Sequence, residues 1–84
     1  MPPTTVTLLS KPGCHLCDDA REIVHAVIAE FADAELVEKS ILDDPQLHAR
    51  YWDEIPVVLI DDDVHTIYRV DVDRLRAALA ERSR

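Results

Sequence analysis

Long apolar stretches are missing from this chain. The longest, Ile55–Ile60, is far shorter than the about 20 residues that a membrane-spanning helix needs. The N-terminal segment Met1–Thr5 carries neither the basic region nor the apolar core of a secretory signal. We therefore expect a cytoplasmic protein, in which a lasting structural disulfide is disfavoured.

Positive charge is also scarce. Lys and Arg total 9 against 17 Asp and Glu, which gives a formal net charge of -8. Such a chain repels the phosphates of nucleic acids and an anionic membrane surface, so we expect neither as a partner. The acidic residues form small scattered groups such as Asp18-Asp19 and Asp61-Asp62-Asp63, a pattern typical of a solvated surface that also repels anionic partners.

Cysteine occurs only as Cys14 and Cys17. An apolar run, Val6–Leu9, precedes the pair, and an amphipathic segment follows it at once. In a cytosolic chain, a C-x-x-C between a strand and a helix is typical of a thioredoxin-like redox motif. A bridge that closes so short a loop stabilises a fold very little, so the pair points to redox chemistry, the alternative being two inert core cysteines.

Hydrophobic residues make up 48% of the 84 residues, which is enough for one small domain, taken as residues 1–84. In the first half of the chain, periodicity and turn residues predict a strand at Thr4–Ser10, a long helix from Leu16, and a strand over Leu36, Val37 and Ile41. A short helix at Pro45–Tyr51, capped by Asp44, and a buried strand at Ile55–Ile60 are predicted next. A turn at Asp61-Asp62-Asp63, a strand at Val64–Val70 and a last helix capped by Asp71 complete the prediction.

The long helix carries one apolar stripe, and the last helix a shorter one. The first consists of Leu16, Ala20, Ile23, Val24, Val27, Ile28 and Phe31; the second consists of Val72, Leu75, Ala78 and Leu79. The resulting order is βαβαββα, an α/β chain without repeats or linkers. The opening βαβ unit predicts parallel pairing with a right-handed crossover, and the last two strands form an antiparallel hairpin.

With the C-x-x-C after the first strand and Ile55-Pro56 opening the third, the chain resembles the glutaredoxin-like branch of the thioredoxin-fold family. The matching residues are Ser10–Cys17 and Ile55-Pro56-Val57, and the element order agrees over essentially the whole chain. The resemblance implies a central mixed four-stranded sheet flanked by three helices. It also implies a cis bond before Pro56, beside the cysteines, which local sequence alone does not predict.

Two departures from that family stand out. Typical glutaredoxins have Pro and Tyr between the cysteines, where this chain has His15 and Leu16. They also carry Gly-Gly and an acidic pair before the last helix, where this chain has no glycine over residues 69–73, and side chains there would crowd a bound peptide. By the resemblance, Lys11, the Ile55 backbone and Asp71 or Asp73 supply part of a glutathione site.

Helix geometry assigns different roles to the two cysteines. Cys14 is expected at the N-terminus of the long helix, where unpaired amides and the helix dipole stabilise a thiolate, the form that attacks disulfides. Cys17 lies one turn further and is expected to resolve the mixed disulfide. His15 as a cation favours the thiolate, whereas Asp18 and Asp19 oppose it, and a purely solvated His15 is the alternative.

Other side chains have weaker cases for a role. Lys11 is the only lysine near the motif and is a candidate for attracting a substrate carboxylate or steadying the thiolate, or else is a plain surface residue. Tyr51 and Trp52 are expected to plug the core under the short helix rather than to line a groove beside the cysteines. The remaining histidines, His25, His48 and His65, lack ligand-like spacing and are expected at the surface or as satisfied core residues.

We thus expect a monomeric thiol–disulfide oxidoreductase without a bound cofactor. Its partners would be a disulfide-containing protein or a small thiol, together with a reductant, either a reductase or glutathione as co-substrate. One alternative is a metal or iron–sulfur protein, for which the two cysteines supply only two of the usual four ligands. A second is an interaction module that keeps the fold without catalysis.

Overall fold

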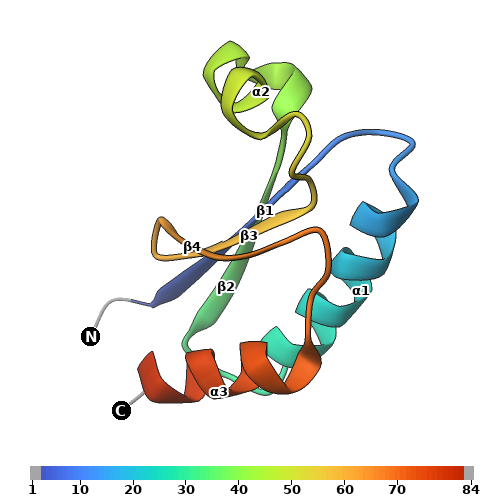
Figure 1. The fold of residues 1–84 in the computed structure, drawn as a ribbon. Helices are drawn as coiled ribbons and strands as arrows, with labels where there is room; N and C mark the ends of the chain where they lie inside the picture. Colours follow the sequence, from blue (N-terminus) through green and yellow to red (C-terminus); the bar gives the residue numbers. More distant parts are fainter. Residues whose placement is uncertain (1–2, 83–84) are drawn as a thin grey trace.

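The computed structural model describes residues 3–82; Met1 and Pro2 of the N-terminal segment considered above lie outside this range. Along the chain the elements are β1 (Thr4–Ser10), α1 (His15–Ile28), β2 (Ala34–Ser40), the short 3-10 helix η1 (Ile41–Asp43), α2 (Pro45–Tyr51), β3 (Val57–Ile60), β4 (Asp63–Ile67) and α3 (Val72–Arg82). The predicted order of strands and helices is confirmed (Figure 1).

The four strands form one mixed sheet in the order β2-β1-β3-β4. Strands β1 and β2 pair in parallel, while β3 pairs antiparallel with both β1 and β4. The register places Leu9 opposite Val57 and Ser10 opposite Ser40. The loop after β1, which holds both cysteines, and the segment before β3, which holds Pro56, therefore leave the same end of the sheet.

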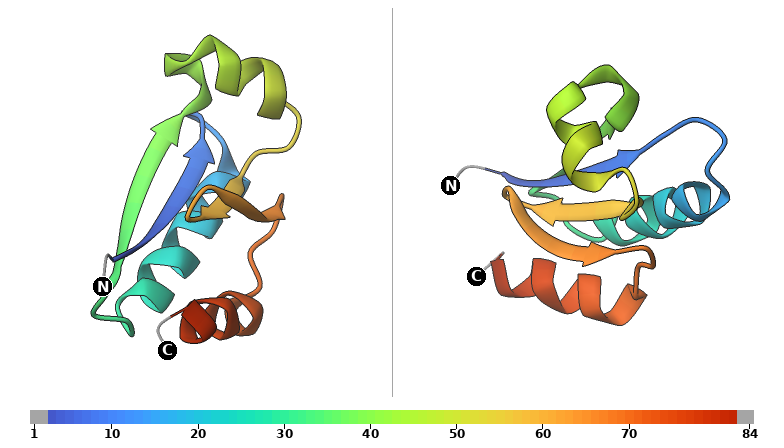
Figure 2. Two further views of the ribbon diagram at one scale, coloured as in Figure 1. Left: turned by 90° about the vertical axis from the view of Figure 1, so that its left-hand side faces the viewer. Right: turned by 45° about the horizontal axis from the view of Figure 1, so that its top comes forward.

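Helices cover both faces of the sheet. Figures 1 and 2 show α1 and α3 together on one face and α2 on the other, near the end where β1 finishes. The larger core lies under α1 and α3 and consists of Val6, Leu8, Ala20, Val24, Val27, Val58, Ile60, Val70, Leu75 and Leu79; the smaller one lies under α2 and consists of Leu9, Ile41, Tyr51 and Val57. Alternation along β1 supplies both cores, because successive side chains point to opposite faces.

The two predicted caps have the expected geometry. The Asp44 carboxylate accepts hydrogen bonds from the backbone N–H groups of Gln46 (2.9 Å) and Leu47 (3.4 Å) at the start of α2. The Asp71 carboxylate accepts one from Arg74 N–H (2.8 Å) at the start of α3. Both aspartates satisfy amides that the first turn of a helix leaves unpaired.

Several predicted boundaries were wrong. Strand β3 begins at Val57, Ile41 belongs to η1, and Asp63 already belongs to β4. Strand β4 ends at Ile67 rather than Val70, because Tyr68 adopts a left-handed backbone conformation with φ of 67° that a strand cannot accommodate.

Both apolar stripes are shorter than predicted. Leu16 at the start of α1 and Val72 at the start of α3 are exposed. The other predicted stripe residues of each helix are buried or partly buried. Phe31 packs against the core from just beyond the end of α1. None of the helices over residues 3–82 is long and apolar enough to cross a membrane.

Candidate active site

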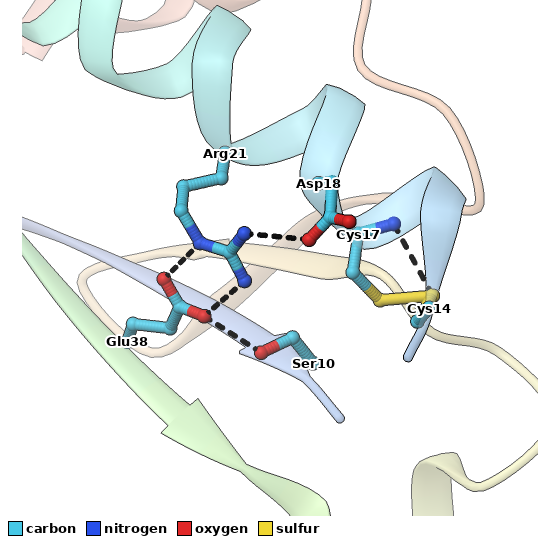
Figure 3. The surroundings of a disulfide bond; sticks show 6 residues. All are labelled: Ser10, Cys14, Cys17, Asp18, Arg21 and Glu38. Atoms are coloured by element: carbon cyan, nitrogen blue, oxygen red, sulfur yellow. Dashed lines mark hydrogen bonds and ion pairs between the residues drawn. A yellow bond between two sulfur atoms is a disulfide. The ribbon is translucent and has the colours of Figure 1, made fainter. Parts of the chain in front are cut away.

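A disulfide joins Cys14 to Cys17 at the N-terminus of α1 (Figure 3). Cys14 is the N-cap residue in an extended conformation, and its Sγ accepts a hydrogen bond from the backbone N–H of Cys17 at 3.2 Å. Its carbonyl accepts one from Asp18 N–H at 3.1 Å. The sulfur thus occupies the place where a capping side chain meets the unpaired amides and the positive end of the helix dipole.

The two sulfurs differ in their access to solvent. Cys17 is fully buried at 0% relative exposure, while Cys14 is partly exposed. Their Cα atoms lie 5.2 Å apart, within the range usual for a disulfide. An incoming thiol or disulfide can therefore reach Cys14 but not Cys17.

The loop that leads into α1 is set by a turn at Pro12-Gly13. Gly13 has φ of +78°, a conformation that side chains rarely adopt, so glycine is the residue that this turn requires. Lys11 and His15, on either side of the turn and the first cysteine, are both exposed. Both predicted candidates thus lie on the solvent side of the cysteine pair.

The Ile55–Pro56 peptide bond is cis, as the family resemblance implied. Pro56 is buried, and its carbonyl accepts a hydrogen bond from the backbone N–H of Tyr68 at 2.8 Å. Because Val57 pairs with Leu9, this segment leaves the sheet at the same end as the cysteine loop. The bond to Tyr68 ties it to the connection between β4 and α3.

A groove of about 300 Å³ lies between the first half of α1 and the connection from β4 to α3. It is lined by Leu16, Asp19, Ala20, Ile23, Tyr68, Arg69 and Val70. Neither cysteine lines the groove, but Leu16, which does, stands between them in the C-x-x-C motif. Its mouth is flanked by exposed apolar side chains, since Leu16 and Tyr68 are 44% and 47% exposed.

The groove adds residues that sequence reasoning missed. Tyr68, Arg69 and Val70 fell within a predicted strand, and of the three only Arg69 and Val70 had been placed near a binding site, by the family resemblance over residues 69–73. Asp71, which was predicted as a substrate contact, is exposed and caps α3 directly after these residues. The predicted cap at Asp71 was a further signal, because a helix cap requires the preceding residues to leave the strand.

A polar cluster lies on the other side of the disulfide (Figure 3). The Arg21 guanidinium donates to both oxygens of Glu38 at 2.6 Å each, and to Asp18 Oδ1 at 2.8 Å. Ser10 Oγ donates to Glu38 Oε2 at 2.9 Å. These bonds raise the pKa of Arg21, chiefly through Glu38, and Arg21 in turn is the main cause that lowers the pKa of Glu38.

The remaining sequence candidates divide into confirmed and corrected predictions. Tyr51 is a buried core residue as predicted, but Trp52 is 59% exposed and plugs nothing. His25 and His48 are exposed as predicted. The prediction for His65 was wrong, because its Nε2 is buried and has no hydrogen-bond partner among residues 3–82. Over residues 3–82, no group of three or more His, Cys, Asp or Glu side chains is arranged to hold a metal ion.

Comparison with known proteins identifies relatives along nearly the whole chain. Residues 5–80 match the family model described as Glutaredoxin-like domain (DUF836). An uncharacterized protein of Mycobacterium tuberculosis is 33% identical over 79 residues, which cover 89% of this chain and 81% of that protein. A glutaredoxin-like protein of Dictyostelium discoideum is 29% identical over 75 residues, covering 83% and 69% of the two chains.

Solved structures with the same fold include protein XcR50 from X. campestris, with a TM-score of 0.74 and 30% identity over 90% of this chain and 96% of that one. Protein Ne2328 from Nitrosomonas europaea has a TM-score of 0.78 and 25% identity, covering 94% of each chain. A mutant thioredoxin from Halobacterium salinarum has a TM-score of 0.70 at 16% identity, covering 95% of this chain and 74% of that one, which shows a shared fold alone.

Proposed function

This chain belongs to the glutaredoxin-like domain family (DUF836) and has a thioredoxin-like fold, and from that premise we propose that it is a thiol–disulfide oxidoreductase. One observation supports the proposal most directly. Cys14 is a partly exposed residue at the N-terminus of α1, while its disulfide partner Cys17 is fully buried. This asymmetry suits a nucleophile and a resolving thiol.

The reaction transfers two electrons from the reduced pair to a substrate disulfide. The Cys14 thiolate attacks one substrate sulfur, a mixed disulfide forms, and the first substrate thiolate leaves. Cys17 then loses its proton, and its thiolate attacks the Cys14 sulfur. The second substrate thiolate leaves, and the Cys14–Cys17 disulfide remains. A thiol reductant restores the dithiol by the same steps in reverse, so the protein needs no bound cofactor.

Residues around the pair suggest how a substrate is held. The groove beside Leu16 offers apolar walls together with the opposite charges of Asp19 and Arg69. Lys11 and His15 lie on the exposed side of the pair and are proposed to attract a substrate carboxylate or favour the thiolate. The Ile55 backbone beside cis-Pro56 and Asp71 at the start of α3 complete the proposed substrate contacts.

The substrate is proposed to be a protein disulfide or a small thiol such as glutathione. A Cys17→Ser variant distinguishes them, because it cannot resolve a mixed disulfide. Equilibrated with oxidised glutathione and analysed by mass spectrometry, it should hold one glutathione on Cys14 if glutathione is the substrate. Rapid reduction of the intact protein by a thioredoxin reductase, without such an adduct, would indicate a thioredoxin-type role instead.

Two controls complete this experiment. A Cys14→Ser variant should form no adduct, because the buried Cys17 is out of reach of the substrate. The intact protein should reduce a disulfide-containing peptide and end as the Cys14–Cys17 disulfide. Thiols that stay inert toward every disulfide offered would refute the proposed function.

A further inference from the structure

Arg21 is placed by α1 next to the buried cysteine. It follows Cys17 by four positions, so the two side chains are neighbours on one side of the helix, with Cβ atoms about 5–6 Å apart. Figure 3 shows the guanidinium between α1 and the ends of β1 and β2, with the Asp18 carboxylate between it and the disulfide in this view. The proposed mechanism assigns this cation no role.

The position of this charge is set by contacts from three elements. Glu38 on β2 accepts two hydrogen bonds from the guanidinium at 2.6 Å, and Asp18 on α1 accepts one at 2.8 Å. Ser10, the last residue of β1, donates to Glu38 at 2.9 Å and so anchors the carboxylate. The Arg21 and Glu38 side chains are each only 33% exposed. A charge held in this way acts on its surroundings from a defined place.

We propose that Arg21 is a positioning residue whose fixed positive charge stabilises the Cys17 thiolate, and that Glu38 both holds Arg21 in place and limits this effect. The inference rests on the proposed function, in which Cys17 must lose its proton before it attacks the Cys14 sulfur. Glu38 is a poor acceptor for that proton, because Arg21 lowers the pKa of its carboxyl. The proton therefore passes to solvent or buffer.

Other charged groups around the pair act in the same field. Helix α1 contributes His15, Asp18 and Asp19, the preceding loop contributes Lys11, and β2 contributes Glu38. The charge of His25 also acts on Glu38. The acidic members oppose the thiolate, so Arg21 is the cation that partly neutralises them at close range. Its removal should leave Asp18 and Glu38 unopposed.

Opposite changes are therefore expected in two variants. Arg21→Gln should raise the pKa of the Cys17 thiol, whereas Glu38→Gln should lower it, because it removes a negative charge and leaves Arg21 less neutralised. For one unit charge on a side chain that is 33% exposed, acting on a buried thiol nearby, the expected shift is on the order of one pKa unit. If Arg21 and Glu38 only stabilised the fold, replacing them would not shift the pKa of the Cys17 thiol in opposite directions.

The chain contains a matched control. Arg76 on α3 donates to both oxygens of Glu30, at 2.8 and 2.9 Å, and to Asp73 three residues earlier at 3.2 Å. This repeats the pattern around Arg21, but it joins α3 to the end of α1 far from the cysteines. Arg76→Gln should therefore leave the thiol pKa unchanged.

The test uses the full chain with Cys14→Ser, so that Cys17 is the only thiol and serine still caps α1. The thiolate is titrated by its ultraviolet absorbance in this background and in the Arg21→Gln, Arg21→Lys, Glu38→Gln and Arg76→Gln variants. We expect Arg21→Lys, which keeps the charge, to stay close to the parent.

Three results would overturn the inference: shifts of the same sign for Arg21→Gln and Glu38→Gln, a shift in Arg76→Gln as large as that in Arg21→Gln, or Arg21→Lys behaving as Arg21→Gln. If Arg21→Gln fails to fold, Glu38→Gln decides by the sign of its shift. The titration needs no turnover, so a protein with the expected shifts but no disulfide exchange would refute the proposed function and leave this inference standing.

Discussion

Tyr68 provides a direct test of how the groove wall is built. Its φ of 67° places a bulky side chain in the left-handed region, and its backbone N–H donates to the Pro56 carbonyl at 2.8 Å. Tyr68→Ala and Tyr68→Gly both delete the ring and keep the N–H. They differ only in the Cβ atom, which is the atom that the left-handed conformation crowds.

The expected magnitudes follow from exposure and backbone geometry. Tyr68 as a residue is 47% exposed, so deleting its ring removes about 100 Å² of buried surface and costs both variants about 2–3 kcal/mol. Glycine should then recover about 1 kcal/mol relative to alanine, because alanine is strained at positive φ. For a domain of this size, that difference corresponds to about 4–8 °C in melting temperature.

Urea unfolding of the oxidised protein measures the pair of variants, with Ile67 as the control position. Ile67 is the last residue of β4, where the backbone is extended and glycine is worse than alanine. We therefore expect Tyr68→Gly to be more stable than Tyr68→Ala, and Ile67→Gly to be less stable than Ile67→Ala. Equal stability of the two Tyr68 variants would refute the left-handed conformation that places Tyr68, Arg69 and Val70 along the groove.

Two further outcomes concern stability away from the cysteines. Burial, then the charges of Arg74 and Arg82, lower the pKa of His65, so the unfolded chain takes up a proton first as the pH falls. Below about pH 6.5 the free energy of unfolding should therefore decrease as the pH falls, and His65 should contribute at most about 1.4 kcal/mol per pH unit to this slope. A His65→Gln variant whose stability has the same pH slope would contradict this. In the hairpin turn, Asp61 and Asp62 have φ of 49° and 72°. Asp62→Gly should stabilise the fold by about 0.5–1 kcal/mol in thermal unfolding. Asp61→Gly should gain less, because the Asp61 carboxylate accepts a hydrogen bond from Thr5 N–H on β1 (3.0 Å) and pairs with Arg82. Equal gains in the two variants would argue against those contacts.

Local patterns predicted most of the elements correctly because each depends on nearby residues. The run of β-branched and apolar residues in Thr4–Ser10, the apolar stripe of α1 and the Asp44 cap each depend on residues only a few positions apart. The errors fall where long-range packing overrides the pattern. The apolar composition of Val64–Val70 favours a strand, but the bond from Tyr68 to Pro56 turns the chain away after Ile67.

The residues of the candidate site also fall into two groups: those that local sequence predicts and those that only long-range packing brings together. Cys14 and Cys17 belong to one local motif, so their spacing and the helix that follows already placed one sulfur at a helix N-terminus and the other a turn deeper. The cis bond before Pro56 came from a family resemblance and not from local preference. Arg69 was indicated only through the family resemblance, which placed residues 69–73 at the glutathione position, and Glu38 lies in no motif.

The amino-acid sequence by itself determined the cysteine pair, the helix that Cys14 caps, the scattered acidic groups and the order of the elements, because those features depend on side chains a few positions apart. Tertiary structure alone decided which distant groups surround the sulfurs. Parallel pairing of β1 with β2 brings Glu38 to Arg21, and antiparallel pairing of β1 with β3 brings Pro56 to the same end of the sheet. These neighbours result from strand register, which is a property of the assembled sheet and of no single segment.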